Sequence, residues 1–252
     1  MKILSIGNSF TQDSHKWLSP IAASRGDTIT AVGLVIGGCT LETHWNHFSS
    51  NACEYAMEVN GCYIKQTTIA DTLRSDNWDI ITLQQASHHS GIFETYDPYL
   101  FDLAKGIKEI CPQSKLYIHQ TWAYETDCSY TLGFQNYNFS QSEMFEKLTA
   151  AYAKAADRLG CDIIPSGEVI QHLRRSLPEF DYQNGGLSLN RDGFHLTATY
   201  GRYAAALTWY GTLLNRDVTN VSFIPEDDAG NKADAALLKK INICVQEVLD
   251  KH

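Results

Sequence analysis

The chain has 252 residues, of which 44% are hydrophobic and 19% are charged, and its formal net charge is -9. This length and composition predict a folded α/β protein with a substantial core and exclude an intrinsically disordered chain. The negative charge argues against nucleic acid or an anionic membrane as the main partner, because both are themselves negatively charged.

The start of the chain and its cysteines bear on the compartment. The first apolar run begins at Lys2, which leaves no room for a signal peptide ahead of it, although a chain whose leader had been removed would read the same. No apolar run approaches the ~20 residues needed to cross a bilayer. Seven scattered cysteines favour reduced thiols, with a Cys53–Cys62 disulfide as the less favoured alternative. These features predict a cytoplasmic protein with no membrane partner.

Apolar, β-branched runs alternate with helical patterns along most of the chain. The expected strands are 2–6, 28–36, 79–84, 115–120 and 162–165. The expected helices are 14–25 with a break at Pro20, 97–110, Ser140 to Gly160, 167–176, 196–214 and 233–250. This repeated order predicts a mostly parallel sheet with helices on both faces. We therefore expect one domain over 1–252, a three-layer α/β/α sandwich of the flavodoxin type.

The segment 43–77 departs from the alternating order. Asn60 and Gly61 stand between two strand-like runs, 54–59 and 62–68, and an Asn-Gly pair in this position predicts a β-hairpin with a two-residue turn. We interpret 43–77 as an insertion near the functional site rather than as a second domain. The last helix, 233–250, is expected either to pack on the sheet or to form a dimer contact.

Two short motifs near the ends of the chain carry the residue types of a nucleophilic triad. Ser9 directly follows the first strand, and Asp192 stands three residues before His195. A serine hydroxyl becomes a nucleophile when a histidine takes its proton, and that histidine needs an acceptor on its other ring nitrogen. The structural alternative is that Ser9 and Asp192 cap helices. The presence of all three residues in this order favours catalysis.

Together these motifs resemble the SGNH (GDSL-like) hydrolase superfamily, and specifically its uncharacterised branch whose first block reads Gly-Asn-Ser-Phe. The resemblance covers most of the chain. It implies an SGNH-type fold, a Ser9, His195 and Asp192 triad, ester hydrolysis through an acyl-enzyme, and no cofactor. Asn8 stands where the superfamily usually has aspartate, and we interpret it as a residue that holds the loop rather than as part of the triad.

The same resemblance implies the donors of an oxyanion hole. The superfamily uses the backbone N–H of the nucleophile, a glycine N–H after the second strand, and an asparagine side chain after the third. Here the first two correspond to Ser9 and to Gly38, with Gly37 as the alternative glycine. The asparagine is missing, and Gln85 offers the same amide one methylene further out. The alternative for Gln85 is a structural role at the end of its strand.

Histidines and aromatic residues follow the same strands. The pairs His44–His47 and His88–His89 lack a third ligand at a diagnostic spacing, so we predict no metal site. Trp45, His88 and Trp122 are expected at the mouth of the cleft, where they would contact substrate.

The sequence therefore predicts a serine hydrolase that cleaves a carboxylic ester, acetyl or another short acyl, on a small molecule or a glycan. One alternative is an acyltransferase that passes the acyl group to a sugar hydroxyl, because both reactions share the acyl-enzyme. The other is a catalytically silent domain that binds a glycan, for which the altered Gln85 block is the only support.

Overall fold

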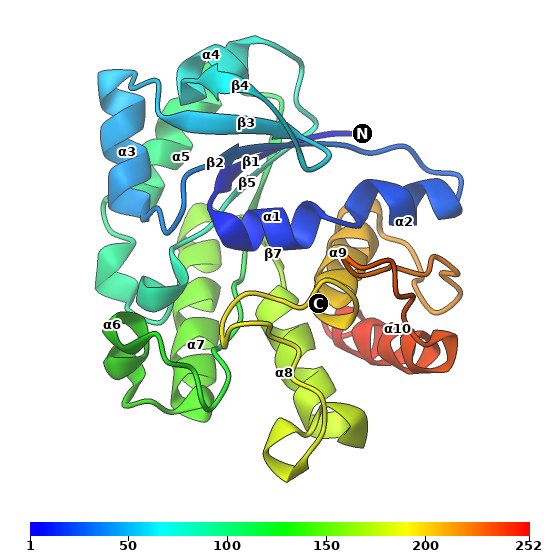
Figure 1. Ribbon diagram of the computed structural model, residues 1–252. Helices are drawn as coiled ribbons and strands as arrows, with labels where there is room; N and C mark the ends of the chain where they lie inside the picture. The colour runs from blue at the N-terminus through cyan, green and yellow to red at the C-terminus, as the bar shows by residue number, and fades with distance from the viewer.

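A seven-stranded sheet forms the centre of the computed structural model, which describes all 252 residues (Figure 1). The strand order across the sheet is β4-β3-β2-β1-β5-β6-β7. The strands are β1 (Lys2–Gly7), β2 (Thr30–Val35), β3 (Tyr55–Val59), β4 (Cys62–Thr67), β5 (Ile80–Leu83), β6 (Lys115–His119) and β7 (Asp162–Ile164). β2, β1, β5, β6 and β7 run parallel, and all residues of β5 are buried, as expected for a strand covered on both faces.

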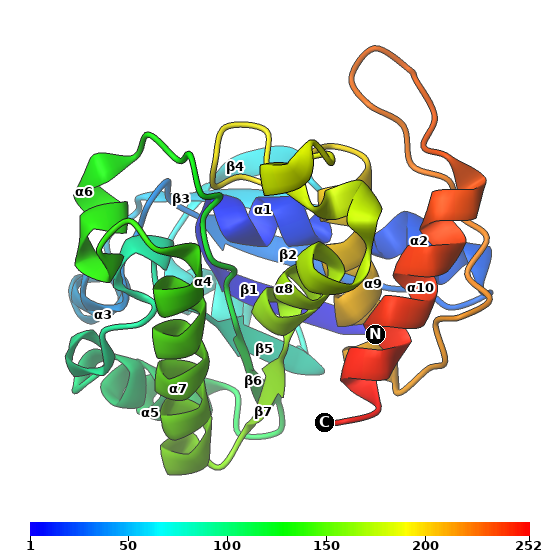
Figure 2. The same ribbon diagram turned by 90° about the horizontal axis from the view of Figure 1, so that it is seen from below.

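Helices cover both faces of this sheet. Figure 2 shows α3, α5 and α7 on one side of the strands and α2, α9 and α10 on the other. The α-helices are α1 (Ser9–His15), α2 (Leu18–Ser24), α3 (Leu41–Ser50), α4 (Ile69–Arg74), α5 (Tyr99–Ile110), α6 (Thr131–Phe134), α7 (Gln141–Leu159), α8 (Ser166–Ser176), α9 (Tyr200–Leu214) and α10 (Ala235–Leu249). Short 3-10 helices span Ser87–His89, Phe93–Thr95, Gln135–Tyr137, Pro178–Phe180 and Tyr182–Asn184. The predicted α/β sandwich with a mostly parallel sheet is confirmed.

The first helical region differs from the prediction. The expected helix over 14–25 is two helices, and the first already begins at Ser9. The break falls at Lys16 and Trp17 rather than at Pro20, which sits in the first turn of α2. Proline is tolerated there because the N–H groups of a first turn have no acceptor within the helix. α9 starts at Tyr200 instead of 196, so residues 196–199 join the Asp192–His195 segment outside regular structure.

The predicted hairpin is β3 and β4, and it extends the main sheet. β3 pairs antiparallel with β2, and Val59 lies opposite Val32. Asn60 and Gly61 both have positive φ, 50° and 79°, as a type I′ turn requires. The turn therefore lies beside the N-terminal half of β2, at the opposite edge of the sheet from Ser9. The other end of the hairpin, where Tyr55 pairs with Thr67, lies beside the carboxyl end of β2. That the insertion as a whole lies near the functional site stays a prediction.

The residues beside the hairpin are helical, and the two cysteines of the less favoured disulfide alternative, Cys53 and Cys62, lie apart. The residues around the hairpin form α3 and α4, whose helical character was not predicted. Cys62 begins β4 at the turn, whereas Cys53 precedes the other end of β3, so the hairpin separates them. All seven cysteines are free.

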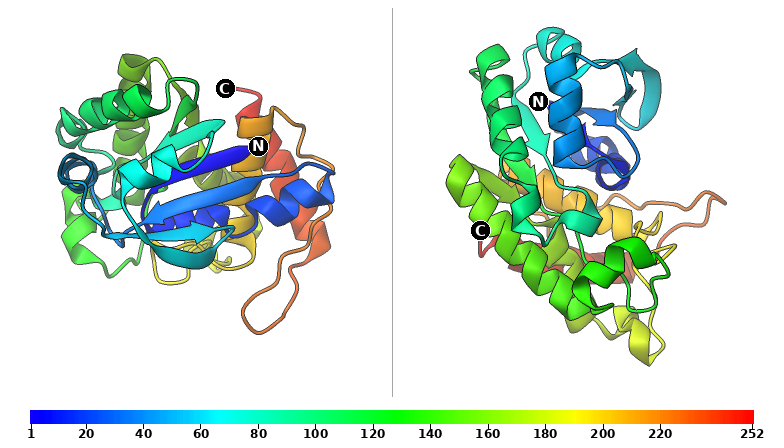
Figure 3. Two further views of the ribbon diagram at one scale, coloured as in Figure 1. Left: turned by 90° about the horizontal axis from the view of Figure 1, so that it is seen from above. Right: turned by 90° about the vertical axis from the view of Figure 1, so that its left-hand side faces the viewer.

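The connection between α9 and α10 extends away from the rest of the chain, as the orange segment in Figure 3 shows. α10 then packs against α8 and α9 on one face of the sheet. None of the helices combines the length and the apolar character that a membrane crossing demands.

Candidate active site

The junction of β1 and α1 places Ser9 at the carboxyl edge of the sheet. β1 ends at Gly7, and Asn8 caps α1 by accepting a hydrogen bond from the Phe10 N–H on Oδ1 (3.0 Å). Ser9 is the first residue of the helix, where its own N–H has no acceptor within the helix. A Cβ on Gly7 would lie 2.2 Å from Thr11 Oγ1, so the strand can turn directly into the helix only with glycine at this position.

The Asn8 side chain also links the junction of β1 and α1 to the loops that follow β2 and β5. Its Oδ1 accepts from Gln84 Nε2 at 2.8 Å, and its Nδ2 donates to the carbonyl of Cys39 at 3.3 Å. An aspartate could accept but could not donate to that carbonyl. The interpretation of Asn8 as a residue that holds the loop is therefore confirmed, and the neutral amide suits this position because both of its ends are used.

The structure brings Ser9, His195 and Asp192 together in one continuous set of contacts. Ser9 Oγ lies 2.8 Å from His195 Nε2, and His195 Nδ1 lies 2.7 Å from Asp192 Oδ2. Asp192 Oδ1 also accepts the backbone N–H groups of Phe194 and His195. Gly193 has a φ of +88°, which lets the chain turn between Asp192 and His195.

The environment of Asp192 keeps its carboxylate ionised. Burial acts to raise the pKa of Asp192, but the hydrogen bonds from the His195 ring and from two backbone N–H groups outweigh it, so the pKa lies below its usual value. An ionised Asp192 accepts from a protonated Nδ1, which leaves the lone pair of Nε2 facing Ser9. This arrangement is suited to removing the hydroxyl proton.

The turn after β2 lies against the same junction. The Cys39 N–H bonds to the Ile36 carbonyl at 3.2 Å, which makes Gly37 and Gly38 the central residues of a β-turn. Gly38 is exposed, has a φ of +63°, and has no atom within 4 Å of where a Cβ would be. Because Asn8 bonds to the Cys39 carbonyl, this turn adjoins the N-terminus of α1.

Gln85 does not belong to this site, and its prediction as an oxyanion donor is wrong. The side chain is fully buried, and its Nε2 donates to the carbonyl and the hydroxyl of Thr95, both at 3.0 Å. Its Oε1 accepts from the backbone N–H groups of Leu41 and Ala86. The amide is therefore fully used in holding the loop after β5 against the start of α3.

Trp122 was expected to contact substrate, and this expectation is also wrong. The indole is fully buried and stacks on Phe10, with ring centroids 4.2 Å apart. Its Nε1–H donates to the Phe194 carbonyl at 2.7 Å. Through this hydrogen bond, Trp122 stabilises the segment that contains His195.

His88 and Trp45 have different relations to the triad. His88 is half-buried and joins a row of rings that passes through Tyr130 and Phe194 to His195, with neighbouring centroids 6.5, 5.3 and 4.2 Å apart. Sequence reasoning missed Tyr130 and Phe194, although Phe194 lies inside the Asp-x-x-His motif. Trp45 packs against Phe48 on α3 and against the core instead.

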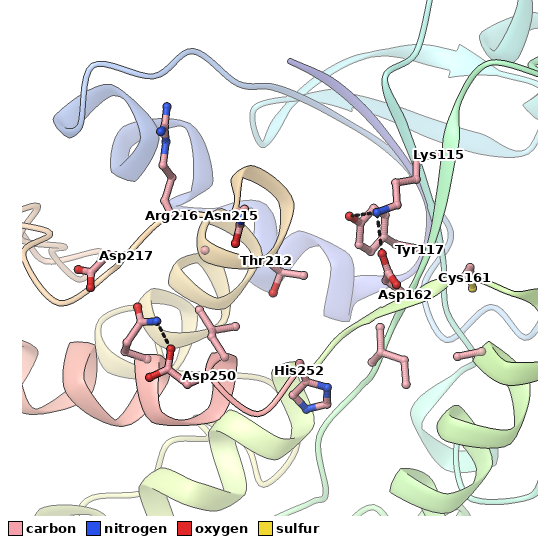
Figure 4. Close-up of a pocket in the computed structure, with 15 residues that line it drawn as sticks. Lys115, Tyr117, Cys161, Asp162, Thr212, Asn215, Arg216, Asp217, Asp250 and His252 are labelled. Atoms are coloured by element: carbon pink, nitrogen blue, oxygen red, sulfur yellow. Dashed lines mark hydrogen bonds and ion pairs between the residues drawn. The ribbon is translucent and has the colours of Figure 1, made fainter.

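A cavity of about 660 Å³ (Figure 4) lies at the amino ends of β6 and β7, the end of the strands opposite Ser9. Lys115 and Asp162 open β6 and β7 there, and their charged groups pair at 2.6 Å. The Lys115 ammonium also donates to the Tyr117 hydroxyl at 2.9 Å. Lys115 and Asp162 therefore neutralise each other at this end of the strands.

One group of side chains has the composition of a metal site. His172 on α8 lies with Cys244 and Glu247 on α10, with donor atoms within 4.8 Å of one another. His172 Nε2 and Glu247 Oε2 are 2.8 Å apart, whereas two ligands of one tetrahedral zinc lie about 3.4 Å apart. Burial and the Glu247 charge raise the pKa of the Cys244 thiol to about 11. As arranged, the group is a hydrogen-bonded pair between two helices beside a neutral thiol.

Known proteins share this architecture. A putative SGNH hydrolase from Slackia heliotrinireducens is 20% identical, with a TM-score of 0.55 over 84% of this chain and 98% of that one. The acetyl xylan esterase AlAXEase is 14% identical, with a TM-score of 0.54 over 84% of this chain and all of that one. These likenesses establish an SGNH-hydrolase type of fold. No curated protein sequence matches the chain.

A nearer relative and a family model define the family. A DUF4886 family protein from Bacteroides uniformis ATCC 8492 is 37% identical, with a TM-score of 0.89 over 99% of this chain and 94% of that one. The model described as "Domain of unknown function (DUF4886)" matches residues 2–241. The chain belongs to the DUF4886 family.

Proposed function

We propose that this protein is a carboxylic ester hydrolase that forms an acyl-enzyme on Ser9. The observation that carries the proposal is the continuous path from Ser9 Oγ through His195 to Asp192, with contacts of 2.8 and 2.7 Å. Three side chains from the two ends of the chain meet at hydrogen-bonding distance in the order that nucleophilic catalysis requires.

The reaction follows from the roles of these atoms. Ser9 Oγ attacks the acyl carbon while its proton passes to His195 Nε2. The ester carbonyl oxygen becomes an oxyanion, for which the backbone N–H groups of Ser9 and Gly38 are the proposed donors. His195 then protonates the departing alcohol, which leaves the acyl group on Ser9. A water molecule, deprotonated by the same nitrogen, attacks the acyl-enzyme and releases the carboxylic acid and free Ser9.

Asp192 acts through His195 in this scheme. Its carboxylate fixes the tautomer with the proton on Nδ1 and stabilises the imidazolium that forms during each proton transfer. The low pKa of Asp192 supports this role, because the carboxylate stays ionised over the range in which imidazole is neutral.

The proposed substrate carries a short acyl group, such as acetyl, on a small molecule or a glycan. Two features support this choice. The similar fold of AlAXEase belongs to an acetyl xylan esterase. Phe194 and Tyr130 provide neighbouring aromatic rings beside His195, on which a sugar ring could stack. Transfer of the acyl group to a sugar hydroxyl uses the same acyl-enzyme, and product analysis with a sugar acceptor distinguishes the two outcomes.

Covalent labelling tests the proposal directly. The protein is incubated with a fluorophosphonate, digested, and analysed by mass spectrometry for the modified residue. We expect modification at Ser9, and none in Ser9→Ala or His195→Ala. In parallel, hydrolysis of a short-chain aryl ester by either variant should fall by at least about 10³-fold. Full esterase activity in folded Ser9→Ala would refute the proposal, and an unlabelled, inactive wild-type protein would favour a silent glycan-binding domain.

A further inference from the structure

Asp13 connects the helix of the nucleophile to the segment of the base. It lies four residues after Ser9, so both side chains are on the same side of α1. The carboxylate is only 1% exposed, yet it is surrounded by donors. Oδ2 accepts from the Leu196 N–H at 2.7 Å, and Oδ1 accepts from Arg202 Nε at 2.8 Å and Arg191 Nη1 at 3.1 Å.

Two of these donors flank the proposed acid and base in the sequence. Arg191 immediately precedes Asp192, and Leu196 immediately follows His195. Arg191 also closes the segment on itself, because its backbone N–H bonds to the His195 carbonyl at 2.8 Å and its side chain bonds to the Leu196 carbonyl. A single carboxylate therefore holds both ends of the loop that carries the proposed acid and base.

Burial of a carboxylate costs desolvation free energy, which an apolar side chain at the same position would avoid. An apolar side chain at a buried position is often as stabilising as a buried ion pair, so stability alone does not explain an aspartate here. A carboxylate with fixed donors does provide what a geometric constraint needs, namely short charge-assisted bonds of defined direction. Arg202 extends the constraint to α9, which packs against α1.

We propose that Asp13 is a positioning residue that sets the distance between Ser9 Oγ and His195 Nε2. The inference rests on the proposed function. Asp13 touches neither substrate nor Ser9; it acts by fixing the 191–196 segment to the same helix that carries the nucleophile. The helix then holds both partners of the proton transfer, and small movements of α1 leave their separation unchanged.

The test compares Asp13→Asn with Asp27→Asn. Asp27 is the control because it, like Asp13, accepts from an arginine, Arg216 at 3.1 Å, while its second donor is the Tyr210 hydroxyl at 2.7 Å, away from Ser9. We expect Asp13→Asn to slow fluorophosphonate labelling of Ser9 by about 10- to 100-fold, because small misplacements of reacting groups cost about that much. KM for an aryl ester should change less than about two-fold, and Asp27→Asn should label like the wild type.

Two further readouts separate positioning from a loss of folding. Misfolding lowers the fraction of protein that can be labelled, whereas mispositioning lowers the rate for the whole population. The proton between Asp192 and His195, visible far downfield by NMR, should persist in Asp13→Asn, because that bond lies within the loop. If Asp13→Asn does not fold, Arg202→Gln removes one donor and should slow labelling several-fold.

The outcomes are distinct for the two proposals. A wild-type protein that is not labelled at Ser9 refutes the proposed function. A labelled wild type whose Asp13→Asn and Arg202→Gln variants react at the wild-type rate refutes the positioning role alone.

Discussion

Ser9 and His195, the two partners of the proposed proton transfer, are held by different kinds of structure. Ser9 belongs to β1 and α1, which are regular and adjacent in sequence. His195 lies between the short 3-10 helix at Tyr182–Asn184 and α9, where no helix or strand forms. Its segment is fixed by distant groups, among them the Trp122 indole and the Asp13 carboxylate. The proposed nucleophile is therefore positioned by local structure, and the proposed base by tertiary hydrogen bonds.

This difference has a consequence for substitutions. Changes around Ser9 affect elements of the sheet and its first helix, so they should alter folding and reactivity together. Changes to the supports of the 190–199 segment should alter reactivity more than stability, because that segment contributes no strand or helix to the core. The following predictions test this contrast, from the largest expected effect to the smallest.

Asp192→Asn should have the largest effect on the base. The amide no longer requires a protonated Nδ1, and the imidazolium loses its charged partner, so we expect hydrolysis to fall on the order of 10³-fold. The carboxyl side chain is 42% exposed, and its loss should leave the unfolding free energy nearly unchanged. Steady-state kinetics with an aryl ester and urea unfolding measure the two quantities.

Asp227→Asn is the control for this variant. Like Asp192, Asp227 stabilises an exposed loop by accepting two backbone N–H groups of that loop, those of Ala229 and Asn231. Its substitution should leave hydrolysis at the wild-type level. Equal activity of Asp192→Asn and the wild type would exclude Asp192 from the triad.

Acid should destabilise the protein through its buried histidines, two of which lie near Ser9. Burial lowers the pKa of His15 on α1 to about 4 and that of His119 on β6 to about 3. Below pH 6.5 these two imidazoles become protonated in the unfolded chain but stay neutral in the folded protein. Their contribution to stability is therefore complete above pH 6.5 and is lost as the pH falls toward about 4 for His15 and about 3 for His119, by roughly 1 kcal/mol per ring and pH unit.

Urea unfolding at pH 7 and pH 5 measures this loss. His15→Gln provides the comparison, because the variant should show a shallower pH slope, by about one proton, even if its stability at pH 7 is lower. An unfolding free energy that is the same at both pH values in the wild type would contradict the predicted role of the buried imidazoles.

Gln85→Ala should affect stability and leave reactivity intact. The substitution leaves the N–H groups of Leu41 and Ala86 and the Thr95 carbonyl without partners, which should cost about 1–3 kcal/mol of unfolding free energy. An oxyanion donor would instead lower the rate by about 10²–10³-fold without a comparable loss of stability. Labelling rate and urea unfolding distinguish the two, and the exposed Gln12→Ala serves as the control.

Gln84 and Gln85 illustrate what a sequence can and cannot predict. The strand before them was predicted because its apolar run depends on short-range pattern alone. Successive side chains in an extended segment point to opposite faces, so the two amides diverge: Gln84 joins Asn8 and His119, and Gln85 joins Thr95. Which amide faces the nucleophile depends on register and on distant partners, which the sequence pattern does not encode.

The same limit applies to the rest of the site. Ser9, Asp192 and His195 could be found because their motifs are short and recur in a known order. The start of α1 at Ser9 was missed because Ser9 and Thr11 are weak helix formers, and this helix packs against α9 rather than depending on its own propensity. Trp122 was misplaced because only the tertiary stack on Phe10 shows that the ring is buried.

Trp122→Phe should have the smallest effect and gives the sharpest test of tertiary positioning. Phenylalanine can retain the aromatic stack on Phe10 but cannot donate to the Phe194 carbonyl. We expect a stability loss of about 1 kcal/mol and a several-fold slower labelling of Ser9, because the carbonyl lies next to His195. Trp78→Phe removes a similar buried indole donor, to the Thr72 carbonyl, and should lose stability alone. If both variants label at the wild-type rate, the base loop does not depend on this hydrogen bond, and its position must be set by the contacts of Asp13.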